Sequence, residues 1–133
     1  MSDSEFADIN VMAVEDEAFS QQVVSAALEK LGVASVSIAD NGADAIAKLS
    51  NADPKIDLII CDIEMPEMPG FELVRKLRYG IVPAYKDVSI VMLTGKDTDR
   101  NAQSARIHRI DGFLVKPVTV ERLRAVIRHA LDK

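Results

Sequence analysis

Short apolar runs alternate along the chain with longer segments whose apolar residues recur at helical spacing. The short runs, which favour buried strands, cover residues 9–14, 36–38, 58–62, 88–93 and 113–115. Each run is followed by polar or turn-forming residues and then by an amphipathic stretch. The pattern therefore predicts five strands, each followed by a helix.

Each amphipathic stretch carries one apolar stripe, which is the face expected to be buried. In the first predicted helix this stripe is Phe19, Val23, Ala27 and Leu31, and Gly32 terminates the helix. The other predicted helices cover residues 43–49, 70–78, 98–106 and 119–131, the last with the stripe Val120, Leu123, Ile127 and Leu131.

Strands that alternate with helices are typical of an α/β protein whose parallel sheet is covered on both faces. We therefore predict a doubly wound, five-stranded parallel sheet of order 2-1-3-4-5 with five helices, the flavodoxin-like arrangement. A chain of 133 residues suits a single domain. The polar residues 1–8 are predicted to be a mobile tail, and residues 9–133 the domain.

The overall charge narrows the possible partners. A net charge of −5 disfavours non-specific binding to nucleic acid or to an anionic membrane. No apolar run reaches membrane-spanning length, and the acidic start is unlike a signal peptide. The single cysteine, Cys61, lies in an apolar run and is predicted to be buried and reduced. We expect protein partners and a cytoplasmic location.

Polar residues follow four of the predicted strands. The first strand ends in Glu15 and Asp16, the third in Asp62, the fourth in Thr94 and the fifth in Lys116. In doubly wound sheets ligands bind outside the carboxyl ends of the strands, where the strand order reverses. These side chains are therefore predicted to form one site.

Three carboxylates at one edge would repel one another unless a cation lies between them. Oxygen ligands of this kind suit Mg²⁺. Next to such a cation, Asp62 is predicted to be the nucleophile that accepts a phosphoryl group. The ammonium group of Lys116 and the hydroxyl group of Thr94 are predicted to bind the phosphoryl oxygens.

These residues resemble the motifs of the response-regulator receiver family. The resemblance includes the acidic pair, the run from Cys61 to Gly70, Thr94 with Gly95, and Lys116 with Pro117. It extends over about residues 9–131, nearly the whole chain. It implies a receiver domain of a two-component system rather than an enzyme. Such a domain catalyses only its own phosphorylation and dephosphorylation. The implied donor is a histidine kinase or a phosphotransfer protein, and the output partner is unknown.

The resemblance also assigns roles to individual positions. It implies that Mg²⁺ is bound by Asp16, Asp62 and the backbone carbonyl of Glu64, with Glu15 supporting the metal through water. It further implies that Lys116 and Pro117 are joined by a cis peptide bond. Phe113 is implied as the aromatic switch residue, acting together with Thr94.

The chain departs from the family pattern at two places outside the site. Residues 107–110 lack the glycine expected before the fifth strand, and the loop 79–87 is longer than the family minimum. At the site itself, Glu64 and Lys96 carry opposite charges on neighbouring loops. We predict that they pair over the phosphoryl group and slow its hydrolysis.

Three alternative functions remain open at this point. Asp62-Ile63-Glu64 loosely resembles the nucleophile of a haloacid-dehalogenase-type phosphatase and its acid/base two residues later. That motif, however, has aspartate at the acid/base position, where this chain has Glu64. A flavodoxin would need a hydroxyl-rich loop after the first strand, where this chain is acidic. A pseudo-receiver that never takes phosphate would have lost an acid or the lysine, and none is lost.

Overall fold

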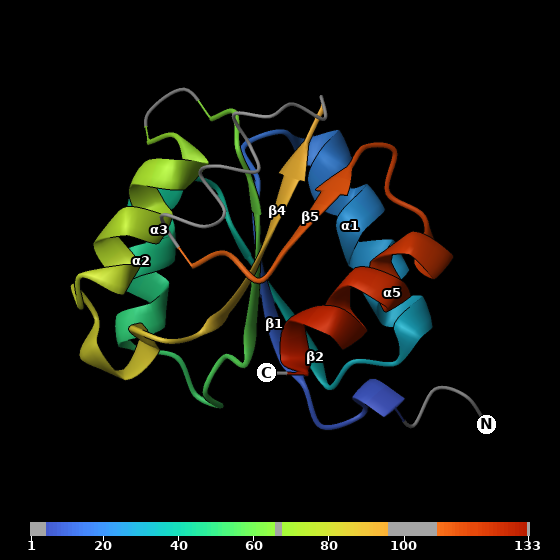
Figure 1. Ribbon diagram of the computed structural model, residues 1–133, viewed down its shortest axis with the longest axis horizontal. Helices are drawn as coiled ribbons and strands as arrows, with labels where there is room; N and C mark the ends of the chain where they lie inside the picture. The colour runs from blue at the N-terminus through green and yellow to red at the C-terminus, as the bar shows by residue number, and fades with distance from the viewer. Residues whose placement is uncertain (1–4, 66–67, 96–108, 133) are drawn as a thin grey trace.

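The computed structural model describes residues 5–65, 68–95 and 109–132. The strands are β1 (Asn10–Val14), β2 (Ser35–Ala39), β3 (Leu58–Asp62), β4 (Ser89–Thr94) and β5 (Gly112–Val115). They form one parallel sheet of order β2-β1-β3-β4-β5, which confirms the predicted topology (Figure 1). The described ranges include the helices α1 (Ala18–Leu31), α2 (Gly42–Ser50), α3 (Gly70–Arg78) and α5 (Val120–Leu131) and the 3₁₀ helix η2 (Pro83–Tyr85). The predicted helix 98–106 lies outside them.

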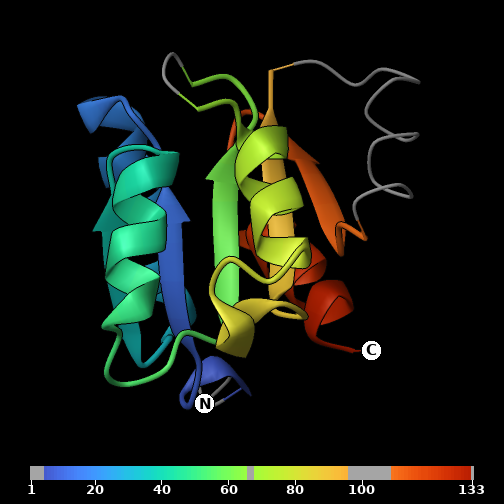
Figure 2. The same ribbon diagram turned by 90° about the vertical axis from the view of Figure 1, so that its left-hand side faces the viewer.

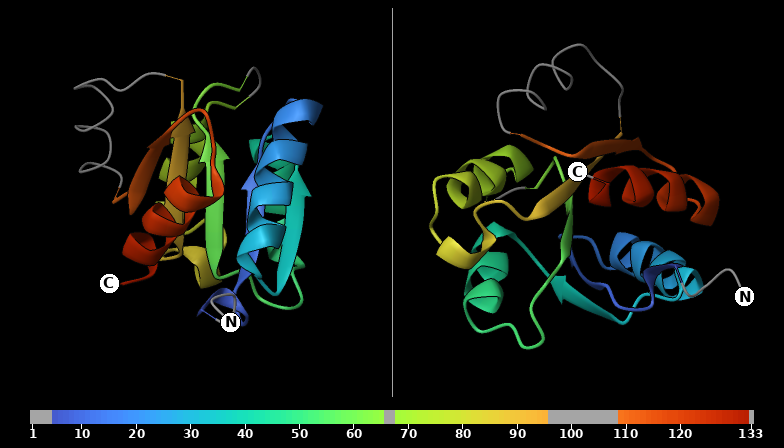
Figure 3. Two further views of the ribbon diagram at one scale, coloured as in Figure 1. Left: turned by 90° about the vertical axis from the view of Figure 1, so that its right-hand side faces the viewer. Right: turned by 60° about the horizontal axis from the view of Figure 1, so that its bottom comes forward.

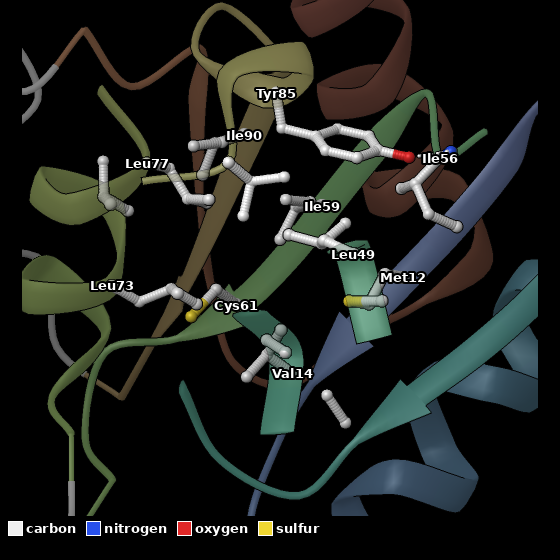
Figure 4. Close-up of a cluster of buried hydrophobic side chains, with 14 of the residues drawn as sticks. Met12, Val14, Leu49, Ile56, Ile59, Cys61, Leu73, Leu77, Tyr85 and Ile90 are labelled. Atoms are coloured by element: carbon white, nitrogen blue, oxygen red, sulfur yellow. Dashed lines mark hydrogen bonds between the residues drawn. The ribbon is translucent and has the colours of Figure 1, made fainter. Parts of the chain in front are cut away.

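The helices cover the two faces of the sheet in pairs. α2 and α3 lie on one face (Figure 2), and α1 and α5 lie on the other (Figure 3). Successive strand residues point to opposite faces. Met12 and Val14 of β1 therefore belong to the core under α2 and α3 (Figure 4), whereas Val11 and Ala13 belong to the core under α1 and α5. The sheet is thus buried on both sides, as expected for a parallel sheet.

The predicted buried stripe of the first helix is wrong at Phe19. The buried residues of α1 are Val24, Ala27, Leu28 and Leu31, while Phe19 is 71% exposed. The four buried residues are spaced by three, four and seven positions and so lie on one face of the helix, whereas Phe19 lies on another. The stripe of the last helix agrees better, because Leu123 and Ile127 are buried and Val120 and Leu131 are partly buried.

The packed part of the chain begins before the predicted boundary at residue 9. Phe6 is 3% exposed and packs in the core under α1 and α5. The carboxylate of Glu5 accepts two hydrogen bonds from Arg128 on α5, at 2.6 and 2.8 Å. The apolar side chain of Phe6 and the bidentate ion pair of Glu5 with Arg128 hold residues 5 and 6 against the domain. The sequence did not indicate this contact, because the residues around Phe6 are polar.

Cys61 is a free cysteine and fully buried, as predicted. Burial raises the pKa of its thiol, so this group stays neutral at physiological pH. Among the described helices, none combines the length and the apolar character that crossing a membrane requires.

Arg78 ties together the segments at the amino-terminal ends of β4 and β5. Its side chain is 8% exposed. The guanidinium group donates hydrogen bonds to the carbonyls of Lys86, Val88 and Arg109, at 2.7–2.9 Å, and contacts Asp111 at 3.4 Å. Arg109 stands where a glycine was expected and has a φ of 54°. The hydrogen bond to its carbonyl helps to hold a backbone conformation that costs about 1–2 kcal/mol in a residue other than glycine.

We predict that Arg78→Ala lowers the free energy of unfolding by about 3 kcal/mol, because three carbonyls and the carboxylate of Asp111 lose a charged donor whose own side chain is almost completely buried. Urea unfolding measures this change. Arg75→Ala is the matched control, since Arg75 is exposed in the same last turn of α3. Its effect should stay within about 0.5 kcal/mol. Equal losses in the two variants would show that the hydrogen bonds of Arg78 do not support the fold.

Candidate functional site

The strand register brings the predicted site residues to one edge of the sheet. Val14 of β1 pairs with Cys61 of β3, so the residues that follow, Glu15 and Asp62, lie at the same level. Asp62 in turn pairs with Leu93 of β4, which immediately precedes Thr94. Thr94 pairs with Val115 of β5, and its carbonyl accepts a hydrogen bond from the backbone N–H of Lys116 at 2.8 Å. The predicted convergence is therefore present.

Two buried carboxylates share the ammonium group of Lys116. Glu15 is 2% exposed and Asp62 is 6% exposed. Nζ of Lys116 lies 3.6 Å from Oε2 of Glu15 and 3.5 Å from Oδ2 of Asp62. Burial favours the neutral form of Lys116, but the two carboxylates outweigh it and raise the pKa of its ammonium group. Lys116 therefore stays charged, and the negative charges of the pair exceed its single positive charge.

Glu15 is the residue most affected by this crowding. Burial raises the pKa of its carboxyl to about 7; the negative charge of Asp62 adds to the rise, and Lys116 opposes it. Oε1 accepts a hydrogen bond from the backbone N–H of Glu17 at 3.3 Å. Oε2 is buried and accepts no hydrogen bond from the described residues. Lys116 pairs with this oxygen at 3.6 Å without a hydrogen bond. A buried carboxylate oxygen that accepts no hydrogen bond is costly, so Oε2 would gain from a further cation.

The donor set fits a divalent cation. Glu15, Asp16 and Asp62 each place one carboxylate oxygen within 4.8 Å of the others. Asp16 is exposed, whereas the other two side chains are buried. Hard oxygen ligands, excess negative charge and an open side are the features of a Mg²⁺ site that keeps several water ligands.

The remaining predicted residues surround this cluster. Thr94 is 5% exposed at the end of β4. Glu64 is exposed, and its backbone N–H donates to Oδ1 of Asp62 at 3.3 Å. The Lys116–Pro117 bond is cis, as expected. Phe113 is partly buried on β5 and contacts Phe71 of α3, with ring centroids 6.5 Å apart. The predicted pairing of Glu64 with Lys96 involves a residue outside the described ranges.

Gly70 allows α3 to begin directly beside Asp62, a role that the sequence analysis missed. Its N–H donates to the carbonyl of Ile63 at 2.9 Å. A Cβ atom at this position would lie 2.3 Å from the carbonyl oxygen of Asp62 and 2.7 Å from the methyl carbon of Met92. Only glycine permits this approach, which brings the first residue of α3 into close contact with the backbone of Asp62.

Gln21 is a second residue that sequence reasoning missed. Its side-chain amide donates to the backbone carbonyl of Glu15 at 2.7 Å and to Oδ1 of Asp40 at 2.9 Å. No motif in the sequence signals such a contact, because its acceptor at Glu15 is a main-chain atom.

With this geometry established, known proteins identify the family. Residues 11–128 match the response regulator receiver domain. The chain belongs to this family. Chemotaxis protein CheY1 of Helicobacter pylori is 31% identical over 124 residues, 92% of this chain and 97% of that protein. The regulator LuxO of Vibrio campbellii is 31% identical over 120 residues, 90% of this chain but 25% of LuxO. The receiver domain thus spans about a quarter of the length of LuxO.

Solved receiver structures share the fold. The chemotaxis protein CheY4 of Vibrio cholerae superimposes with a TM-score of 0.84 at 35% identity, covering 94% of this chain and 100% of that one. The receiver domain of the Arabidopsis thaliana histidine kinase CKI1, solved with Mg²⁺ and BeF₃⁻, gives 0.83 at 29% identity, covering 99% and 96%. This receiver domain is therefore a module of two-component signalling, and the family supports a signalling role rather than that of a turnover enzyme.

We predict that Gly70→Ala lowers the free energy of unfolding by about 1–3 kcal/mol, because the new methyl group must displace the backbone of β3 or the side chain of Met92. Thermal or urea unfolding measures the loss. Gly95→Ala is the control at the same sheet edge, since a Cβ there meets no described atom within 4 Å. A Gly70 variant as stable as the Gly95 variant would contradict the close approach.

We also predict that Glu15 makes the metal-free protein less stable as the pH rises. The folded-state pKa of about 7 exceeds the ordinary value of 4.5. A proton on Glu15 therefore favours the folded state, and this contribution is lost as the pH rises through the folded pKa. From about pH 5 to about pH 7.5, wild type should lose on the order of 2 kcal/mol relative to Glu15→Gln.

The measurement is urea unfolding in a chelator at the two pH values, read as the difference between wild type and the Glu15→Gln variant. Taking this difference cancels the titration of histidines and other groups that both proteins share. Parallel pH profiles for the two proteins would show that the carboxyl of Glu15 does not titrate in this range.

Proposed function

We propose that this receiver domain is the phospho-acceptor switch of a two-component system and takes a phosphoryl group on Asp62. The observation that carries the proposal is the position of Asp62, buried at the end of the central strand β3 between an acidic pair and Lys116. The donor is a phosphohistidine of a histidine kinase or of a phosphotransfer protein. The cytoplasmic location stays a prediction.

In the proposed reaction the carboxylate of Asp62 is the nucleophile. One of its oxygens forms a bond to phosphorus while the bond between phosphorus and the donor nitrogen breaks. The imidazole of the donor keeps the electron pair of that bond and takes up a proton. The backbone N–H of Glu64, 3.3 Å from Oδ1, helps to orient the carboxylate.

Lys116 and Thr94 would bind the transferred group. The ammonium group already lies 3.5 Å from Oδ2 of Asp62, so it can pair with a phosphoryl oxygen added there. Thr94 ends the neighbouring strand β4 at the level of this carboxylate, which suits its hydroxyl group as a donor. Mg²⁺, held by Asp16, Asp62 and the carbonyl of Glu64 with support from Glu15, would supply positive charge that offsets the negative charge of transfer.

Phe113 is the proposed switch residue of the output face. It lies on the edge strand β5 and pairs with Met92 of β4, two positions before the pair of Thr94 with Val115, and its ring contacts Phe71. A partly buried aromatic ring beside the site can change its packing when Thr94 engages a phosphoryl group. The output partner remains a protein of unknown identity, and a direct role of nucleic acid or membrane is not proposed.

The alternatives differ in what they do with phosphate. Family membership disfavours the flavodoxin and the haloacid-dehalogenase-type phosphatase. A receiver reacts once per molecule, whereas a phosphatase turns over a phosphate ester. A pseudo-receiver would accept no phosphoryl group at all, although it would keep the fold.

We predict that acetyl phosphate adds one phosphoryl group to the protein when Mg²⁺ is present, but not in excess chelator. Intact-mass spectrometry after acid quenching detects the adduct. Asp62→Asn should abolish it, whereas Asp132→Asn, which removes a carboxylate far from the site in sequence, should be labelled as wild type. Labelling that survives in the Asp62 variant would place the acceptor elsewhere. Absence of labelling in wild type, together with no Mg²⁺ binding, would favour the pseudo-receiver.

A further inference from the structure

The main chain of Glu15 is held on both sides. Its N–H donates to the carbonyl of Ala39 at 3.0 Å, which extends the ladder between β1 and β2 by one residue. Its carbonyl accepts the 2.7 Å hydrogen bond from Nε2 of Gln21 on α1. The second contact fixes the orientation of the peptide group that joins Glu15 to Asp16.

This peptide group determines where the carboxylate of Asp16 points. Asp16 is exposed, so core packing does not orient its side chain. The direction of its Cα–Cβ bond therefore depends on the backbone of the connection between β1 and α1. A rotation of the Glu15–Asp16 peptide would move the carboxylate of Asp16 away from those of Glu15 and Asp62.

The side chain of Gln21 is itself held in place by the residue that follows β2. Its amide donates a second hydrogen bond, at 2.9 Å, to Oδ1 of Asp40, which directly follows β2. The N–H of Asp40 donates to Oδ2 of Asp44 in the first turn of α2, at 3.0 Å. The two donor hydrogens of the Gln21 amide are thus both used: one binds the carbonyl of Glu15, and the other binds the carboxylate of Asp40 at the end of the neighbouring strand.

We propose that Gln21 is a positioning residue of the cation site, which acts through the backbone carbonyl of Glu15, with Asp40 as its anchor. This inference rests on the proposed function, because it assumes that Glu15, Asp16 and Asp62 bind Mg²⁺. Groups that orient metal ligands typically contribute 10–100-fold to metal affinity. Gln21 fixes the exposed ligand Asp16 relative to the two buried ones.

The test compares Gln21 with its neighbour Gln22, which is exposed on the same helix. Gln21→Ala removes both hydrogen bonds, and Gln21→Glu keeps the shape but replaces the donor by a carboxylate that repels Asp40. Gln22→Ala and Gln22→Glu make the same changes in helix propensity and net charge. MgCl₂ is titrated into each metal-free protein, and the amide NMR shifts of residues 12–16 and 61–64 give the dissociation constant.

We expect both Gln21 variants to bind Mg²⁺ about 10-fold more weakly or worse, and both Gln22 variants to stay within about 2-fold of wild type. Asp40→Asn, which keeps an acceptor oxygen for Gln21, should bind more tightly than Asp40→Ala. In the Gln21→Ala background, Asp40→Ala should add little further loss, because both residues act through one contact.

Urea unfolding of the metal-free variants separates positioning from general stability. A Gln21→Ala protein that is less stable but keeps the wild-type dissociation constant would overturn the proposal and leave Gln21 a structural residue. The Asp16→Ala variant tests the premise that Glu15, Asp16 and Asp62 bind Mg²⁺. If wild type binds no Mg²⁺, or if Asp16→Ala binds it equally well, the proposed metal site is wrong, whatever the Gln21 variants do.

Discussion

The burial of two carboxylates around a single ammonium group is the constraint on which the site depends. Glu15 and Asp62 follow paired residues of adjacent strands, so they cannot separate without breaking the ladder between β1 and β3. Lys116 lies about equally far from both, at 3.6 and 3.5 Å, and can neutralise only one negative charge. Burial, together with the negative charge of Asp62, raises the pKa of Glu15. A cation at this edge of the sheet would relieve the repulsion without any movement of the strands.

Buried backbone surrounds the carboxylates of Glu15 and Asp62. All five residues of β3 are buried, and Gly70 brings α3 against the last of them. A phosphoryl group on Asp62 would add further negative charge at a point that the backbone cannot vacate. In the proposed switch, the response would therefore come from Thr94 at the end of β4, from Lys116 directly after β5, and from the partly buried Phe113 on β5. Such an arrangement would couple the proposed phosphorylation of Asp62 to the packing of the edge strand β5.

Much of this arrangement could be predicted from sequence because it follows from periodicity and topology. Buried strands that end in Asp62 and Thr94 read as apolar runs, and the parallel order places their ends together. The contacts of Arg78 and Gln21 could not be predicted, since most of their acceptors are backbone carbonyl oxygens, which no sequence motif marks. Phe19 was misassigned because α1 offers apolar residues on more than one face, and only packing against the sheet selects the buried one.

Glu15 and Asp16 are neighbours in sequence but contribute to the site in different ways. Glu15 is buried, and its backbone and carboxylate are held by Ala39, Gln21, Glu17 and Lys116. Asp16 is exposed and can exchange between water and a bound ion at little desolvation cost. A site built only from buried carboxylates would bind a cation tightly but would destabilise the metal-free fold. A site built only from exposed ones would lack the fixed geometry that Mg²⁺ demands. In the proposed cation site, two buried carboxylates and the exposed one of Asp16, whose peptide link to Glu15 is held by Gln21 of α1, would combine reversible binding with defined geometry.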